Sequence, residues 1–417
     1  MQVAIIGGGI GGLSLALMLE AAGFGKNVRV YEAVSEIRAL GVGINLAPHA
    51  MKTLGALGLL PALREVAVEP LEFTFFTALG QLVYSEPAGV HAGYPMPHLS
   101  IHRGDLQMVL LAAVIERLGP EAVVCGHRCI GVDQDADGVD VRFVDTRGNA
   151  LPSVRADVAI GCDGIHSAIR QQFYPDEGPP VFHGVNMWRG VTKAKAFLTG
   201  RSHVRIGGLN TTNKIVIYPI RDNIDGNGTQ LINWNTEVVT DNLSDVVDWN
   251  KPGTTEDAIA PFKSWVYDWI DVPQLIRDAD INLSFPMVDR DPVGRYTFGR
   301  VTLLGDAAHP MYPRGGNGGA QSILDARVLT DLLVTLEPRA ALEEYDRVRV
   351  PAVSAIVERN RTAPPDVIID TVERLTQGKR FEKIEDVIDP AKLREMSQSY
   401  RRLVGSDLAS VGGKGDG

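Results

Sequence analysis

The chain has 417 residues, which is too long for one compact core and predicts two domains, or one domain with insertions. Its 45% hydrophobic and 22% charged residues are typical of a soluble globular protein, and three cysteines point to a reducing, cytoplasmic environment. A net charge of -10 argues against a nucleic-acid partner, because no basic stripe neutralises phosphates. The sequence also indicates neither a signal peptide nor a membrane span, since glycines interrupt the first apolar run and no stretch is long enough.

A glycine-rich turn follows the first expected strand. Gly7, Gly9 and Gly12 fit the spacing of a dinucleotide site. In such sites the first glycine forms a tight turn, the second admits a pyrophosphate, and the third lets a helix pack on the strand. Glu32 ends the second expected strand, where an acid usually binds ribose hydroxyls. An acid at that place favours an unphosphorylated adenosine ribose, as in FAD or NAD.

The next elements complete a domain of alternating strands and helices. Helices are expected over residues 50–57 and 106–118. Side chains alternate between the two faces of a strand, so the next expected strand has Cys125, His127 and Cys129 on one face. A zinc site would need a fourth ligand, and none is near in sequence. We therefore expect a packed strand face and no metal.

The pattern changes between residues 181 and 285. Strand-like runs at 214–218 and 229–234 are separated by turn clusters, which predicts an antiparallel sheet inserted into the nucleotide-binding domain. The chain returns to the first domain with a strand at 300–306, and helical patterning dominates from residue 321 to about 403.

Two further signatures accompany the N-terminal glycines. A strand over 157–162 ends in Asp163 and Gly164, and Asp306 begins a proline- and glycine-rich loop that runs to residue 321. In this order and at these separations, the three motifs resemble the group A flavoprotein aromatic hydroxylases, over most of the chain. Stretches at 35–38, 40–45, 187–191 and 285–292 are most similar to the member that acts on 5-methylphenazine-1-carboxylate, and the salicylate and 6-hydroxynicotinate hydroxylases are slightly less similar.

This resemblance implies the para-hydroxybenzoate hydroxylase fold, which is α/β with a Rossmann-like FAD-binding domain, an inserted antiparallel substrate sheet and C-terminal helices. The domains implied are FAD-binding over 1–75, 99–180 and 286–345, substrate-binding over 76–98 and 181–285, C-terminal helices over 346–405, and a disordered tail over 406–417.

The resemblance also implies a set of FAD contacts. Asp306 would bind the ribityl chain, and the loop before the next helix would offer amides to the flavin ring. The cofactor-binding residues expected are Gly7, Gly9, Gly12, Glu32, Gly43, Arg103, Gln107, Asp163, Asp306, Gly318, Gly319 and Ala320. No histidine or cysteine stands at an evident linking position, so the FAD is expected to be noncovalent.

The implied reaction is hydroxylation of an electron-rich aromatic or N-heteroaromatic, phenolic or carboxylated, through a flavin C4a-hydroperoxide formed with O2. Only one dinucleotide fingerprint is present, so NAD(P)H is expected to bind transiently. The catalytic residues implied are Tyr218, His309 and Pro313, and the substrate-binding residues are Tyr218, Trp188, Arg189, Trp234 and Pro313. For Tyr218 an interface packing role is an alternative, and for His309 a structural role in its turn.

Rival enzyme classes do not fit the chain. Flavin halogenases carry a W-x-W-x-I-P stretch, whereas Trp265 and Trp269 are spaced differently. Baeyer–Villiger oxygenases need F-x-G-x-x-x-H, and Trp188 stands at the histidine position after Phe182. Three classes remain: an FAD-dependent hydroxylase, a flavin oxidoreductase that does not hydroxylate, and a non-catalytic FAD-fold protein that binds a small aromatic. We expect a monomer or homodimer.

Overall fold

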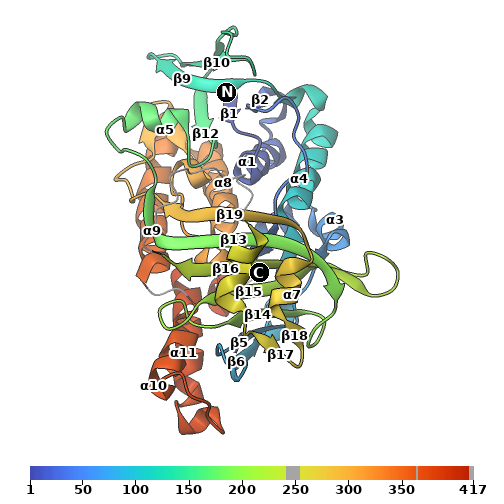
Figure 1. Ribbon diagram of the computed structural model, residues 1–417. Coiled ribbons are helices and arrows are strands. Elements are labelled where there is room, and N and C mark those ends of the chain that lie inside the picture. Colours follow the sequence, from blue (N-terminus) through green and yellow to red (C-terminus); the bar gives the residue numbers. More distant parts are fainter. Residues whose placement is uncertain (241–253, 363–364, 413–417) are drawn as a thin grey trace.

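A computed structural model describes residues 1–240, 254–362 and 365–412 of the chain (Figure 1). Its first layer is a six-stranded sheet in the order β20-β21-β12-β1-β2-β8, parallel except for edge strand β20. Every residue of β1 is buried, as expected for a central strand covered on both faces. The strands are β1 (Val3–Ile6), β2 (Val28–Tyr31), β8 (Val123–Val124), β12 (Val158–Gly161), β20 (Thr297–Phe298) and β21 (Val301–Leu303).

Helices α1, α4 and α8 pack with this sheet into the largest hydrophobic core of the protein. Helix α1 is buried along most of its length, because its side chains are apolar on nearly every face. The helices of this half are α1 (Ile10–Ala21), α2 (Pro48–Ala56), α3 (Leu60–Glu65), α4 (Arg103–Leu118), α5 (Ala168–Phe173) and α8 (Gly318–Thr335).

A seven-stranded sheet forms the second layer, in the order β19-β13-β16-β15-β14-β5-β6. All its pairs are antiparallel except the pair of β14 with β5. We call this layer the insert sheet. Its strands are β5 (Glu72–Phe76), β6 (Leu82–Pro87), β13 (Val181–Lys195), β14 (Ser202–Ile206), β15 (Lys214–Arg221), β16 (Thr229–Val239) and β19 (Ala279–Asp289).

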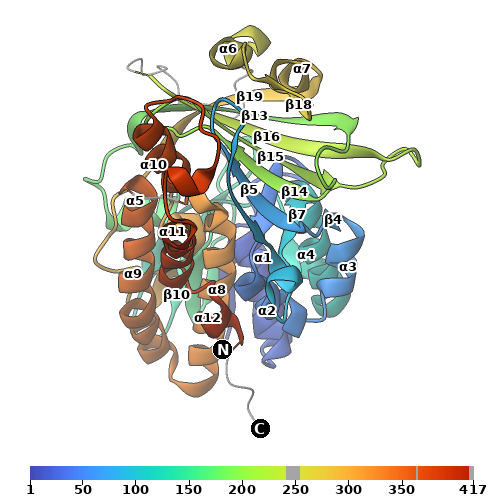
Figure 2. The same cartoon turned by 90° about the horizontal axis from the view of Figure 1, so that it is seen from below.

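The two faces of the insert sheet have different neighbours. Helices α6 (Thr255–Ile259) and α7 (Val272–Arg277) cover one face, and the FAD-domain helices lie on the other side (Figure 2). Successive residues of a strand point to opposite faces. Trp234 therefore packs with the covering helices, and its neighbours Asn233 and Asn235 face the first layer.

Smaller elements join the layers. Strands β3 (Gly43–Leu46), β4 (Ala67–Val68) and β7 (Leu99–His102) form a sheet beside the insert, and β9 (Arg128–Gln134), β10 (Val139–Val144) and β11 (Val154–Ala156) form another at the far end, while β17 (Val266–Tyr267) pairs with β18 (Ile270–Asp271). The C-terminal helices are α9 (Pro338–Thr362), α10 (Val367–Thr376), α11 (Pro390–Leu403) and α12 (Leu408–Gly412). Among the described residues, no helix is both long and apolar enough to cross a membrane.

The structure differs from the sequence-based domain boundaries at three places. Strand β5 begins at Glu72 and β19 ends at Asp289, so the insert sheet extends past both predicted limits of 76 and 285. Helix α9 begins at Pro338, inside the segment assigned to the FAD domain. These limits depend on strand pairing between distant segments, which local patterns do not contain.

The predicted disordered tail over 406–417 is a second correction. Residues 408–412 form α12, Val411 is buried, and the Lys52 Nζ donates to the Val411 carbonyl oxygen over 3.2 Å. Residues 413–417 lie outside the described part of the chain. The expected strand carrying Cys125 is also interrupted, because β8 ends at Val124 and β9 begins at Arg128.

Candidate active site

The three fingerprint glycines have different surroundings. A Cβ on Gly7 would lie 2.3 Å from the Cys162 carbonyl oxygen, and one on Gly12 would lie 2.0 Å from the Gly7 carbonyl oxygen. A Cβ on Gly9 would meet no atom within 4 Å. Gly7 and Gly12 are thus required by packing, whereas Gly9 leaves open space at the N-terminus of α1, where its helix dipole is positive. A phosphate group fits that space.

Two side chains hold this glycine turn from the neighbouring elements. The amide of Gly8 donates to Glu32 Oε2 over 2.7 Å, and Gln107 Nε2 donates to the Gly8 carbonyl oxygen over 2.8 Å. The other oxygen of Glu32 accepts from the Val34 amide over 3.0 Å. Each carboxylate oxygen keeps a second lone pair, so Glu32 is able to bind ribose hydroxyls while it holds the turn.

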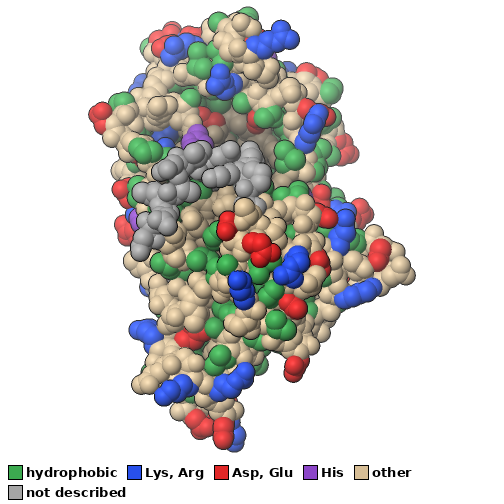
Figure 3. Space-filling model, viewed as in Figure 1, with side chains coloured by type: hydrophobic (Ala, Val, Ile, Leu, Met, Phe, Trp, Pro, Cys, Tyr) green, Lys and Arg blue, Asp and Glu red, His purple; other side chains and the backbone are tan. Residues whose placement is uncertain are grey.

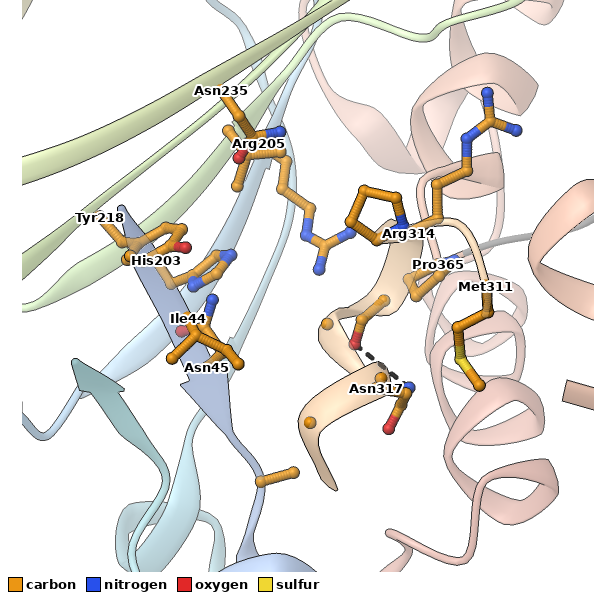
Figure 4. A pocket seen from close by; sticks show the side chains of 18 of the residues that line it. Ile44, Asn45, His203, Arg205, Tyr218, Asn235, Met311, Arg314, Asn317 and Pro365 are labelled. Carbon is orange, nitrogen blue, oxygen red and sulfur yellow. Dashed lines mark hydrogen bonds between the residues drawn. The ribbon is translucent and has the colours of Figure 1, made fainter. Parts of the chain in front are cut away.

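A cavity of about 360 Å³ separates the insert sheet from the FAD domain. In Figure 3 a hollow lies between the FAD domain and strand β19, with acidic and basic side chains interspersed on this face. Figure 4 shows Tyr218, His203 and Arg205 on the sheet side of the cavity, with Met311 and Asn317 across from them. The sequence-predicted residues that line it are Gly43, Arg103, Arg189, Tyr218, Asp306, Pro313, Gly318 and Gly319.

A glycine turn at the start of α8 forms one wall of the cavity. Gly315 and Gly316 both have positive φ, at 77° and 66°, a conformation that side chains disfavour. The side chain of the N-cap residue of α8, Asn317, does not cap the first-turn amides, so these amides and the positive helix end remain open toward the cavity. Gly318 and Gly319 line it, and Ala320 lies one residue further on, fully buried.

Two carboxylates belong to different ends of the site: Asp306 lies beside Gly318 at the start of α8, and the Asp163 backbone lies beside Gly7 in the turn before α1. Asp306 has an exposed surface that faces the open cavity, but protein atoms surround the rest of the residue. This desolvation raises the pKa of Asp306, while the charges of His309 and Arg103 lower it. Asp163 accepts a hydrogen bond from the Ala168 amide, while its Oδ1 is buried without a partner among the described residues. Desolvation raises the pKa of Asp163 to about 6. A buried oxygen with no partner is suited to a ligand donor.

Tyr218 projects from β15 of the insert sheet and Arg189 from β13, and β16 lies between these two strands. The Tyr218 ring is buried and stacks on His203, with ring centroids 4.6 Å apart. Desolvation raises the pKa of Tyr218, while the Arg189 charge and a hydrogen bond with Asn45 oppose the rise. Arg189 also donates to the Gly43 carbonyl oxygen over 2.9 Å, which ties the sheet to the FAD domain.

These features together fit FAD. The space at Gly9 and the acid Glu32 suit the pyrophosphate and ribose of a dinucleotide, while Asp306 and the open end of α8 lie at the cavity. An elongated cofactor can therefore reach from the α1 turn to the cavity. FAD supplies redox chemistry to such a site when bound.

Comparisons with known proteins agree with this geometry. The family model described as "FAD binding domain" matches residues 1–360. The chain is 39% identical to a phenazine 1,6-dicarboxylic acid hydroxylase of Lysobacter antibioticus, covering 97% of both chains. It is 33% identical to a 3-amino-4-hydroxybenzoate 2-monooxygenase of Streptomyces platensis, covering 99% of this chain and 98% of the relative. Among solved structures, a salicylate hydroxylase substrate complex matches with a TM-score of 0.74 at 24% identity, covering 99% of this chain and 97% of the other.

The chain therefore belongs to the FAD-binding-domain family. Within that family it is an FAD-dependent aromatic hydroxylase that uses NAD(P)H and O2. Its fold is that of para-hydroxybenzoate hydroxylase.

Three of the predicted catalytic or substrate-binding residues do not line the cavity. His309 is buried beside it, and its Nε2 contacts Asp325 Oδ2 at 2.5 Å. Asp325 also accepts from Arg349 Nε at 2.6 Å, so His309 belongs to a buried polar cluster with Asp325 of α8 and Arg349 of α9. Trp234 and Trp188 pack on the helix-covered face of the insert sheet. The residue pattern of β13 alone does not show which of its faces points to the cofactor.

The sequence marks Lys214 as a candidate pocket residue, but it does not reveal the buried ion cluster that Lys214 joins on the sheet side of the cavity. Lys214 Nζ lies 2.5 Å from both Glu237 Oε1 and Asp366 Oδ2, Arg314 Nε lies 3.2 Å from Glu237 Oε2, and Arg205 pairs with Asp366. Alternation along β15 puts Lys214 and Tyr218 on one face, because they are four residues apart in that strand. Asp366 comes from the distant C-terminal region, and no local signal links it to the sheet.

The fingerprint glycines can be separated experimentally. Gly9→Ala adds a methyl group into open space, so we expect the FAD-free protein to keep its melting temperature while FAD affinity falls at least about tenfold. Gly12→Ala forces a clash with backbone and should destabilise the apoprotein itself. Melting curves and flavin-fluorescence titration test both variants. Unchanged FAD binding by the Gly9 variant would contradict the assignment of the space at Gly9 to a phosphate group of FAD.

Trp234 tests the assignment of sheet faces. Its ring is fully buried, and its Nε1 donates to Thr192 Oγ1 over 3.0 Å. Trp234→Ala should therefore lower the free energy of unfolding by about 3–5 kcal/mol. The folded variant should bind FAD and aromatic ligands as the parent does, by titration at low temperature. If the variant lost only its affinity for aromatic ligands, Trp234 would be a substrate-binding residue.

Proposed function

We propose that the aromatic substrate binds between the insert sheet and the glycine turn of α8, against Tyr218 and Pro313. The supporting observation is that Tyr218 and Arg189 face the cavity from the sheet, while Pro313 and Gly318 face it from the FAD domain. The insert sheet therefore covers the cavity on the side opposite the FAD domain, as a substrate-binding layer would.

Tyr218 is proposed to act on the ring substituent that activates the substrate. The raised pKa keeps the Tyr218 hydroxyl protonated at neutral pH, so it donates a hydrogen bond. A donor directed at a substrate hydroxyl stabilises the phenolate form, and a phenolate directs oxygen to its ortho and para positions. General acid–base help of this kind contributes about 10²-fold or more.

We propose a phenolic or carboxylated aromatic as the substrate. The relatives named above act, according to their names, on a phenazine dicarboxylic acid and an aminohydroxybenzoate, and a third relative, 27% identical, is a 6-hydroxynicotinate 3-monooxygenase of Pseudomonas fluorescens. The charges of the cavity support an anionic ligand. Six basic side chains line it (Arg103, Arg189, Arg205, Lys214, Arg314 and Arg401) against three acidic ones (Glu86, Glu237 and Asp306).

We further propose that the protein works in the cytoplasm, as a monomer or homodimer. The three cysteines are free, which suits a reducing compartment. A panel of hydroxylated and carboxylated aromatics, followed by NAD(P)H consumption and product formation, tests the substrate assignment.

The role of Tyr218 has a direct test. Tyr218→Phe should slow hydroxylation far more than NAD(P)H-dependent flavin reduction, so that hydrogen peroxide accumulates in place of product. Stopped-flow absorbance and a peroxide assay measure the two effects.

Tyr345→Phe is a matched control, because it removes a buried hydroxyl that has no hydrogen-bond partner in the described part of the chain. It should leave the coupling of NAD(P)H use to product unchanged. If the Tyr218 variant also hydroxylates with full coupling, Tyr218 is a packing residue.

A further inference from the structure

The glycine turn before α8 has little support of its own. Gly315 and Gly316 are both left-handed, and the turn's own backbone supplies one bond, from the Gly316 amide to the Pro313 carbonyl oxygen. Glycine is the residue that loses most conformational freedom on ordering. Something outside the turn must therefore fix the position of Gly318 and the open end of α8.

Tyr400 of α11 supplies that support. Its hydroxyl accepts a hydrogen bond from Asn317 Nδ2 at 2.9 Å and donates one to Asn360 Oδ1 at 2.7 Å. Both partners are buried. A Cβ on Gly315 would lie 2.1 Å from the Tyr400 hydroxyl oxygen, so the absence of a side chain at Gly315 lets the hydroxyl approach the turn.

Asn360 extends the contact to the other end of the loop. It lies on α9, and its Nδ2 donates to the Tyr312 carbonyl oxygen over 3.3 Å. The loop from Tyr312 to Asn317 is thus held at both ends through one hydroxyl and one carboxamide. Ile356, Tyr400 and Val404 form a small apolar cluster around this contact.

The direction of the Asn317 side chain has a consequence for the cofactor site. Asparagine before a helix commonly caps the helix's own first-turn amides. Here Asn317 is the N-cap of α8 but makes no such bond, and its Nδ2 binds Tyr400 and the Gly315 carbonyl oxygen. The amides at the start of α8 are left to the cavity.

We propose that Tyr400 is a positioning residue for the flavin-binding turn, which holds the open end of α8 toward the cavity through Asn317 and Asn360. The C-terminal helices thereby set the electrostatic environment of the cofactor from outside the cofactor-binding motifs. This inference uses the FAD site and does not depend on the substrate proposed above.

Tyr400→Phe tests the proposal with two readouts that need no aromatic substrate. We expect FAD to bind at least about fivefold more weakly, since one buried hydrogen-bonding group is lost. We also expect the reduction potential of bound FAD to become more negative, because a displaced helix end stabilises the extra negative charge of the reduced cofactor less well. Fluorescence titration and spectroelectrochemistry measure these quantities.

Asn360→Leu removes the partner of the same hydroxyl and should produce both effects. The double variant should be little worse than either single one, because both changes break one network. Tyr345→Phe, on the α9 helix and away from the cavity, should change neither quantity. A Tyr400 variant with a lower melting temperature but unchanged FAD affinity and potential would overturn the proposal and leave Tyr400 as a packing residue.

Discussion

Close approach of other groups to glycine backbone, possible only where a side chain is missing, joins the parts of this protein. Gly12 lets α1 approach the Gly7 carbonyl oxygen, which shapes the phosphate end of the site. Gly43 lets β3 approach the insert sheet, since a Cβ there would lie 2.6 Å from Asn233 Cγ. Gly315 admits the Tyr400 hydroxyl. The contacts at Gly43 and Gly315 each join a segment at the cavity to a different structural unit, so the site depends on tertiary packing as well as on its own motifs.

Charge is distributed unevenly between the surface and the cavity. The chain as a whole carries more acidic than basic residues, 51 against 41, whereas basic side chains outnumber acidic ones around the cavity. Lys214 and Arg205 share Asp366, and burial of such charges is tolerated because they are paired. Desolvation lowers the pKa of buried His203, and the charges of Arg205 and Lys214 lower it further. The His203 ring is therefore neutral beside Tyr218.

The positions of the proposed cofactor motifs could be predicted from sequence because each motif is local. The fingerprint glycines, Glu32 and Asp306 follow strand ends, and the ends of parallel strands meet at one edge of a sheet. Trp188 and Arg189 show where this reasoning ends. They are adjacent in β13 and point to opposite faces of the insert sheet. Which of these faces is buried under helices depends on where α6 and α7 pack, and β13 does not encode that. His309 stands in a cofactor loop, yet Asp325 draws its side chain out of the cavity. Tyr400 lies outside every motif, and its role follows from contacts with residues 40 and 83 positions away.

The central claim is that the chain forms an FAD-dependent hydroxylase whose insert sheet holds an aromatic ring at the cofactor. Turnover under ¹⁸O2 with NAD(P)H and an accepted aromatic, followed by mass spectrometry of the product, tests it most directly. The account predicts one ¹⁸O atom in each hydroxylated product molecule and none from H2¹⁸O in the converse experiment. Oxidation of NAD(P)H that yields only hydrogen peroxide with every aromatic, or product oxygen derived from water, would contradict it.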